Sequence, residues 1–329
     1  MTTTNEHALG AILGALTGDA AGAVLEFFGG TITDENVTHA MSMPGGGTWE
    51  VAPGQVTDDG ELTMSLLRGL VDAPDDPIPA VAARYAAWVA SDPFDIGATT
   101  SASLGCLRKR DPSWAEIAKK DGPHVAMRTA ARERCMRSKA NGSMMRSTPL
   151  AVWGASRDVD RVVAITRADV ELSHPNPACV VSTIAYVRAI RRLIVSPNDV
   201  RAAIAEAREA AREDDEVRGW LEDAIERDVV VPFSPQDGFV KIGFSHAFRH
   251  LARGTTYEDA MRVTLLGGGD TDTNAAIVGG LLGARFGMSA VPGPMREAVL
   301  ACDTKRGANE RPHDLHPRDV PSLVARLMC

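Results

Sequence analysis

The sequence has few cysteines, and those it has do not pair in any usual ligand spacing. Five cysteines occur among 329 residues, an odd number, with no CxxC pair and no cysteine/histidine pattern. This excludes a disulfide framework and disfavours a zinc site, so we expect a reducing cytoplasm as the location. Hydrophobic residues make up 44% and charged residues 24% of the chain. Such a chain can bury a substantial core, and we expect one compact domain over residues 1–329.

The sequence also lacks a long uninterrupted apolar run and an excess of basic residues. The apolar stretch of residues 8–28 is broken by Asp19 and Glu26, and no Lys or Arg precedes it, so we expect neither an export signal nor a membrane span. The formal charge of −8 gives no electrostatic reason to expect a nucleic acid or an anionic membrane as partner. No Lys or Arg occurs before Arg68. The acidic residues of that segment therefore need cations, water or distant arginines.

Apolar residues recur at helical spacing, and long alternating or β-branched runs are scarce, which predicts an all-α fold. We find no repeat of fixed period, so a solenoid is not expected. Loops are predicted where Gly, Pro and Asp gather, the longest over Phe28–Gly54. Helices are predicted over Glu6–Gly18, Asp59–Val71, Pro79–Val89, Thr99–Arg108, His124–Ser138, Asp158–Leu172, Ala178–Val195, Asp199–Glu213, Glu216–Asp228, Phe239–Arg253, Thr256–Leu265, Thr273–Phe286 and Pro294–Asp303.

Two acidic motifs precede apolar helices. Thr57, Asp58 and Asp59 stand directly before a leucine-rich helix, a position at which Thr and Asp commonly cap backbone N–H groups. The second motif places Asp270 and Asp272 among threonines and behind three glycines. A helix cap uses one such side chain. The second motif therefore has more oxygen-bearing side chains than a cap needs.

Carboxylates and hydroxyls without His or Cys are suited to hard cations such as Mg²⁺, Mn²⁺ or Ca²⁺. The spacing is not that of an EF-hand. Four clustered carboxylates repel one another, and two divalent cations would relieve that repulsion. We therefore expect Asp58, Asp59, Asp270 and Asp272 to meet in the fold. The alternative is two unrelated capped helices.

At this point five motifs, in this order, resemble the ADP-ribosylglycohydrolase family. The resemblance implies an all-α fold with a binuclear Mg²⁺ or Mn²⁺ centre that removes ADP-ribose from a protein side chain or a small molecule. The motifs cover the chain from about residue 8 onwards and are Gly18–Gly22 with Glu26, Thr57–Gly60, Asn141–Arg146, Ser173–Pro175 and Gly268–Thr273.

The resemblance also assigns roles. The implied metal ligands are Thr57, Asp58, Asp59, Asp270, Asp272 and Thr273. Glu26 matches a mobile acid that closes over the metals, although by itself it is an acid at the end of an apolar helix. Asp95 resembles an acid that approaches the ribose in the arginine-specific branch, but Ala98 stands where Asn is expected, and Asp95 could equally cap the next helix. Glu26, Asp59 and Asp95 are the candidates for the catalytic base, and the sequence does not choose among them.

The predicted substrate contacts lie in a small-residue loop and a proline-flanked turn. Gly142 and Ser143 could present backbone N–H groups to a pyrophosphate, whereas Arg146 is either a phosphate ligand or a residue that pairs inside the protein. His174 is implied to lie at the adenosine side, although a lone turn histidine is commonly a packing residue. The full predicted set is Asn141, Gly142, Ser143, Met144, Met145, Arg146 and His174.

Two other functions fit the same residues. One is an ADP-ribose-binding or structural member without hydrolysis, as in lens crystallins that resemble this family. The other is a different binuclear hydrolase such as a phosphoesterase. The expected partner is ADP-ribose or an ADP-ribosylated protein, with no nucleic acid and no membrane. The sequence leaves open the linkage (arginine, serine or O-acetyl), the choice of Mg²⁺ or Mn²⁺, and the oligomeric state, for which a monomer is one option.

Overall fold

The structure is a computed structural model that describes residues 3–108 and 112–328. Within these residues the only β pairing is two isolated bridges, between Gly46 and Val51 and between Ala140 and Phe239, and the all-α prediction is confirmed. The α-helices are α1 (Thr3–Gly22), α2 (Asp34–Met41), α3 (Asp58–Asp72), α4 (Pro77–Ala90), α5 (Ala98–Ser103), α6 (Pro112–Asp121), α7 (Pro123–Arg134), α8 (Thr148–Gly154), α9 (Val159–Val170), α10 (Pro177–Val195), α11 (Val200–Ala211), α12 (Asp215–Ile225), α13 (Val240–Arg253), α14 (Tyr257–Leu266), α15 (Thr271–Phe286), α16 (Gly293–Leu300) and α17 (Val320–Met328).

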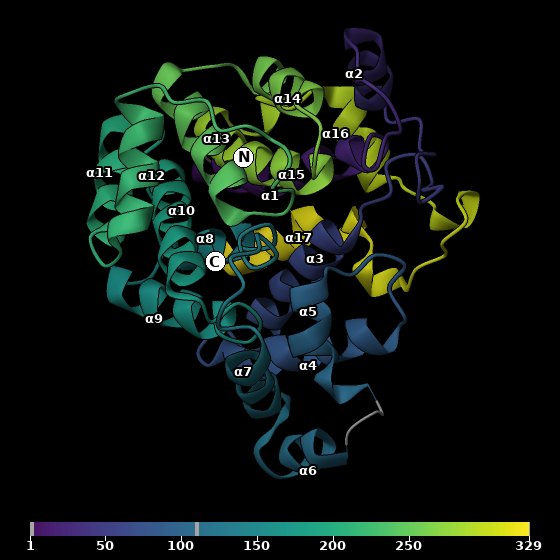
Figure 1. Ribbon diagram of the computed structural model, residues 1–329, viewed down its shortest axis with the longest axis vertical. Helices are drawn as coiled ribbons and strands as arrows, with labels where there is room; N and C mark the ends of the chain where they lie inside the picture. The colour runs from purple at the N-terminus through teal and green to yellow at the C-terminus, as the bar shows by residue number, and fades with distance from the viewer. Residues whose placement is uncertain (1–2, 109–111, 329) are drawn as a thin grey trace.

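Helices α1 and α15 form the centre of the molecule and lie against each other (Figure 1). Both are buried over most of their length. Glycines spaced by four along α1 allow this contact, because a Cβ at Gly14 would lie 2.3 Å from the carbonyl oxygen of Gly279, and one at Gly18 would lie 2.2 Å from that of Ala275. The two backbones therefore touch with no side chain between them. This packing brings the end of α1 beside the start of α15.

Hydrogen bonds fix the pair in register. The Thr271 hydroxyl of α15 donates to the carbonyl oxygen of Gly22 at 2.8 Å. On the neighbouring helix α14, the Tyr257 hydroxyl donates to the carbonyl oxygen of Gly14 at 2.9 Å and ties α14 to α1. Because Thr271 and Gly22 stand next to the second acidic motif and the Glu26 turn, this register sets the geometry of the site.

Some helices depart from the sequence prediction. Helix α2 lies inside the predicted loop Phe28–Gly54, and it is short, with a Thr33/Asn36 capping box and few buried residues. Helix α8 carries Pro149 in its first turn, where no N–H is needed, so that the proline starts a helix. The predicted helix Thr99–Arg108 is split into α5 and a 3₁₀ turn over Leu104–Leu107. Helices α6 and α17 were also not predicted.

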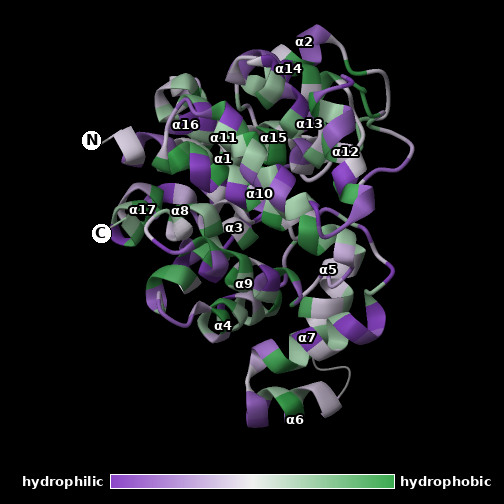
Figure 2. Ribbon diagram, turned by 90° about the vertical axis from the view of Figure 1, so that its left-hand side faces the viewer, coloured by the Kyte–Doolittle hydropathy of each residue, from purple (hydrophilic) through white to green (hydrophobic). Residues whose placement is uncertain are grey.

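The outer helices carry hydrophilic and hydrophobic residues side by side, as amphipathic helices do (Figure 2). Helix α6 packs on α7 and lies at one end of the molecule in both views (Figures 1 and 2). In the described part of the chain, no helix combines the length and the apolar character that a membrane crossing requires.

Candidate active site and metal centre

The two acidic motifs meet although more than two hundred residues separate them. The Thr57 hydroxyl donates to Oδ2 of Asp272 at 3.2 Å, and the Thr273 hydroxyl donates to Oδ2 of Asp59 at 3.1 Å. Each motif thus supplies a hydroxyl to a carboxylate of the other. The N-termini of α3 and α15 therefore face each other.

The interpretation of these motifs as helix caps is wrong in detail. Thr57 and Asp270 occupy the N-cap positions of α3 and α15, yet neither side chain accepts a capping hydrogen bond. Asp19 of α1 takes that role for α3, since its carboxylate accepts from the backbone N–H of Thr57 at 3.0 Å and of Gly60 at 2.8 Å. This leaves the acids of both motifs available to face the site.

Asp19 was given no role from the sequence. The signal was present, because Asp19 is the only charged residue between Ala8 and Leu25, inside a run that is almost entirely buried. A buried carboxylate there needs partners, and it finds them on α3. Burial, opposed by these hydrogen bonds, raises the pKa of Asp19 to about 7.

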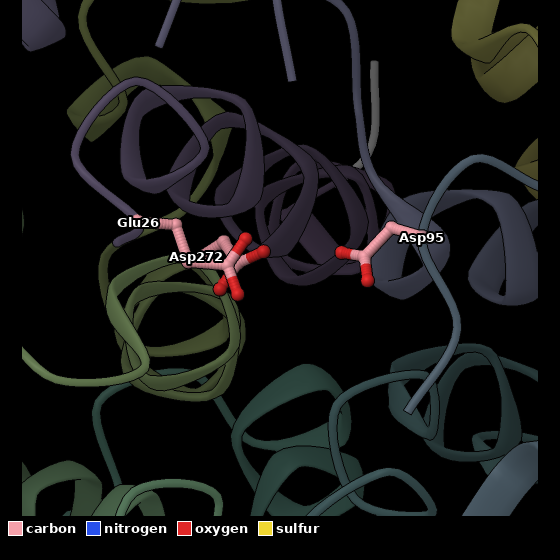
Figure 3. Close-up of side chains that lie close together, drawn as sticks. All are labelled: Glu26, Asp95 and Asp272. Atoms are coloured by element: carbon pink, nitrogen blue, oxygen red, sulfur yellow. The ribbon is translucent and has the colours of Figure 1, made fainter. Parts of the chain in front are cut away.

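Glu26, Asp95 and Asp272 come together at the centre of the site. One carboxylate oxygen from each lies within 4.8 Å of the others. Figure 3 shows the Glu26 and Asp272 side chains together, with the Asp95 carboxylate directed toward them. The group combines one predicted metal ligand with two of the predicted catalytic acids. Asp95 does not cap α5, whose N-cap residue is Gly97.

The electrostatics of the site follow from burial and mutual repulsion. Burial raises the pKa values of Asp58, Asp59 and Asp272 well above the usual range, and neighbouring carboxylates add to the effect. Burial and the charge of Asp95 raise the pKa of Glu26 to about 7, and burial raises that of Asp95 to about 6. The protein alone therefore does not hold all these groups ionised at neutral pH.

The donor set fits divalent cations. Oδ1 of Asp59 is buried and has no hydrogen-bond partner, an unusual state for a carboxylate oxygen. The surrounding donors are carboxylate and hydroxyl oxygens, which hard cations prefer. Cations placed here would satisfy the orphaned oxygen and offset the repulsion that raises the pKa values.

A cavity of about 840 Å³ opens over these acids. Asn141 lines this cavity, and the side-chain amide of Asn141 donates to Oδ2 of Asp270 at 2.7 Å. Of the predicted site residues, those that line the cavity are Glu26, Asp58, Asp95, Asn141, Gly142, Met145, His174, Asp270, Asp272 and Thr273. Thr57, Asp59, Ser143, Met144 and Arg146 lie behind its wall.

Arg146 is therefore not placed to bind a ligand phosphate. Its guanidinium is fully buried and donates to the carbonyl oxygen of Gly142 at 2.6 Å, to the Tyr85 hydroxyl at 2.9 Å and to the Ser173 hydroxyl at 2.8 Å. Asp169, also buried, balances its charge. Of the two roles considered from sequence, pairing inside the protein is the one the structure shows, and it holds the Gly142 and Ser173 segments together.

His174 lies beside Gly142 on the cavity wall. Burial lowers its pKa to about 3, so the ring is neutral at physiological pH. Its Nδ1 pairs with the Ser173 hydroxyl at 2.8 Å, and its Nε2 has no partner among the described residues. A Cβ on Gly142 would lie 2.9 Å from the ring. His174 therefore limits what residue can occupy position 142.

Trp49 lies in the long loop before α3 and was not among the predicted site residues. Its indole N–H donates to Oε2 of Glu26 at 2.6 Å, and Asn309 in turn donates to the Trp49 carbonyl oxygen. A single tryptophan in a glycine-rich loop carries no motif that would have pointed to this contact.

The fold and the site define an all-helical protein with a cavity lined by carboxylates from segments that lie far apart in the chain. Residues 1–320 match the family model described as ADP-ribosylglycohydrolase, and the chain belongs to that family. The family membership expected from the five motifs is confirmed.

Several relatives have names that describe hydrolases of ADP-ribosylated substrates. The chain is 26% identical over 294 residues to the ADP-ribosyl-[dinitrogen reductase] glycohydrolase of Rhodospirillum rubrum, covering 88% of this chain and 89% of that protein. It is 23% identical over 317 residues to the ADP-ribosylarginine hydrolase Tri1 of Serratia proteamaculans, covering 90% and 75%. A solved structure titled ADP-ribosylglycohydrolase-related protein complex has the same fold, with a TM-score of 0.73 and 24% identity, covering 100% of this chain and 99% of that one.

Proposed function

We propose that this protein hydrolyses the glycosidic bond that links ADP-ribose to a protein side chain or a small molecule, with the help of two divalent cations. The observation that carries the proposal is the convergence of Glu26, Asp95 and Asp272 within 4.8 Å beneath a cavity of about 840 Å³. Relatives are named for acting on ADP-ribosylated dinitrogen reductase and on ADP-ribosylarginine. Their names make a protein-linked ADP-ribose the leading substrate class.

The cations would be Mg²⁺ or Mn²⁺, both of which accept oxygen-rich sites. The residues that would hold them are Thr57, Asp58, Asp59, Asp270, Asp272 and Thr273. When bound, such ions supply Lewis acidity and charge neutralisation next to the reacting sugar. The orphaned oxygen of Asp59 and the raised pKa values support this assignment.

The cavity must also take the diphosphate of ADP-ribose. Among the described residues that line it there is no Lys and no Arg. The phosphates would therefore meet neutral donors, and Gly142 and Gly267–Gly269 bring bare backbone to the cavity wall. Such segments can bind anions through successive N–H groups. We assign the phosphates to these glycine segments in place of Arg146.

Proton transfer falls to Glu26 or Asp95. Asp59, the third candidate, does not line the cavity, whereas both others do. In the metal-free protein their pKa values are raised to about 7 and about 6, and bound cations would lower them toward the range in which a carboxylate is ionised and can take a proton from water. In the proposed reaction this water attacks the anomeric carbon while the bond to the side chain breaks.

A substrate panel tests the proposal. The protein is incubated with ADP-ribosyl-arginine, ADP-ribosyl-serine, O-acetyl-ADP-ribose and a generic phosphodiester, each with Mg²⁺ or Mn²⁺ or with a chelator. We expect release of free ADP-ribose that depends on the cation. Phosphate release without ADP-ribose would establish a phosphoesterase instead, and binding of ADP-ribose without turnover of any substrate would establish a silent member of the family.

A further inference from the structure

Three aromatic rings lie next to the carboxylates of Glu26 and Asp95. Phe27 follows Glu26 in the chain, Phe94 precedes Asp95, and Trp49 lies between them. The Trp49 ring meets Phe27 edge-on at 6.0 Å and Phe94 edge-on at 5.9 Å between centroids. We call Phe27, Trp49 and Phe94 the aromatic row. Phe27 and Trp49 line the cavity, and Phe94, which is not part of the lining, contacts the Trp49 ring.

The fold exposes the Phe27 side chain to solvent and places its backbone in an unfavourable conformation. Its side chain is 67% exposed, the largest exposure among the exposed large hydrophobic residues of the described chain. Its backbone φ of +56° lies in the left-handed region, which bulky side chains rarely adopt. The turn is fixed at Glu26, whose carboxylate accepts from Trp49 and whose carbonyl oxygen accepts from the Thr48 hydroxyl. A large apolar ring is thus kept at the edge of the cavity and not packed into the core.

The position of the row says which part of a substrate it would meet. This step rests on the proposed function, in which the bond that breaks lies beside Glu26 and Asp95. Since the row is built on the residues adjacent to these two acids, it borders the group attached at the anomeric carbon. That group is the acceptor side chain, which departs when the bond is cleaved.

The part of the cavity wall next to the aromatic row is suited to a planar cation. The cavity wall combines aromatic rings with the carboxylates of Glu26 and Asp95 and, within the described residues, has no Lys and no Arg, while the pKa of His174 is lowered so that its ring is neutral. A guanidinium is planar, stacks on aromatic rings and pairs with carboxylates. A serine linkage is short and uncharged and gains neither contact. We propose that the aromatic row and Asp95 form an acceptor subsite for the guanidinium of an ADP-ribosylated arginine.

Phe27→Leu tests the subsite, because it keeps an apolar side chain but removes the ring. An exposed residue can be changed in this way with little risk to folding. Phe286→Leu, at the far end of α15 from the acidic motif, is the matched control. For each variant kcat/KM is measured on ADP-ribosyl-arginine and on ADP-ribosyl-serine, and the Kd of free ADP-ribose is measured by calorimetry.

We expect the wild-type protein to favour the arginine substrate by at least about tenfold. Phe27→Leu should lower kcat/KM on that substrate by about fivefold, the size of an exposed cation–π contact, and leave the serine substrate and the Kd of ADP-ribose unchanged. Phe286→Leu should change none of the three. An equal loss on both substrates, or weaker binding of free ADP-ribose, would overturn the acceptor subsite.

The wild-type result separates the two proposals. Cleavage of the panel without preference for the arginine linkage overturns the subsite alone and leaves the glycohydrolase function standing. Failure to release ADP-ribose from any substrate overturns the proposed function and, with it, the subsite.

Discussion

Arg311 and Glu61 form a two-pronged ion pair inside the protein. Nε of Arg311 donates to Oε1 of Glu61 at 2.7 Å, and Nη2 donates to Oε2 at 3.0 Å. The same guanidinium donates to the carbonyl oxygens of Ser91 and Asp92 and to the Ser91 hydroxyl. Glu61 lies on α3, one turn after Asp58, and the Ser91–Asp92 segment leads to Asp95. Arg311 therefore joins the helix of the first acidic motif to the loop of a candidate base.

Arg311→Lys should lower kcat by about tenfold while changing the KM for substrate little. Lysine keeps the charge next to Glu61 but cannot reach the carboxylate and two carbonyl oxygens together, so the Asp95 loop loses its anchor. Arg311→Gln would remove the cation that balances the buried Glu61 carboxylate and leave it only the Trp88 indole N–H, which donates to Oε2 at 2.7 Å. This change should cost about 3–5 kcal/mol of the free energy of unfolding.

Kinetics and urea unfolding measure both Arg311 variants. Arg68→Lys is the control, since Arg68 also pairs with the C-terminal region, at Asp319, but away from the cavity. An unchanged kcat in a folded Arg311→Lys protein would contradict the positioning role.

Asp272→Asn and Asp270→Asn should each weaken binding of Mg²⁺ and Mn²⁺ by about 100-fold and reduce release of ADP-ribose to a similar extent, because an amide is a poorer ligand for a hard cation. Calorimetric titration of the cation gives the first quantity. Asp237→Asn, which removes a cavity acid outside both motifs, should leave cation affinity within about twofold. Full activity of Asp272→Asn would exclude the metal assignment.

Trp49→Phe should move the acidic limb of the pH–rate profile to higher pH. The indole N–H holds the pKa of Glu26 down, and its loss raises that pKa further, so a higher pH is needed to ionise the carboxylate. The limb is read from kcat/KM between pH 5 and 9. A profile that keeps its position would mean that Glu26 does not set it.

The metal-free protein should be more stable at pH 5 than at pH 8. Folding raises the pKa of Glu26 from 4.5 to about 7 and that of Asp95 from 3.8 to about 6. Groups with raised pKa values contribute stability below their unfolded pKa and lose it as the pH rises through the folded one. In chelator, Tm should therefore fall by several degrees across this window, and Mg²⁺ or Mn²⁺ should restore it at pH 8. A Tm that rises with pH in chelator would contradict this.

Gly14→Ala should destabilise the whole fold. A methyl group at this position would lie 2.3 Å from the Gly279 carbonyl oxygen, so α1 and α15 would have to move apart. We expect a loss of about 3 kcal/mol in the free energy of unfolding, at the upper end for an overpacked core. Gly219→Ala on α12, where nothing lies within 4 Å, is the control and should be neutral or slightly stabilising. Equal stabilities of the two variants would show that the central helices tolerate separation.

The sequence by itself determined the helical class and the acids of the site. Helical periodicity and turn chemistry are local properties, and they located the long helices such as α10 and α15 closely. The excess of oxygen around Asp270 and Asp272 over what one cap needs could also be read locally. Short helices such as α2 were missed because few of their residues are buried and their ends depend on neighbours.

Only the tertiary structure decided how those acids are used. Asp19 caps α3, Arg146 pairs inside the protein, and Trp49 donates to Glu26. Each of these contacts joins segments that lie apart in the chain. Hydrogen bonds and ion pairs act over a few ångströms, and a linear pattern does not say which distant segments come within that range. For the end of α1 and the start of α15, the close packing of these two helices decides which residues meet.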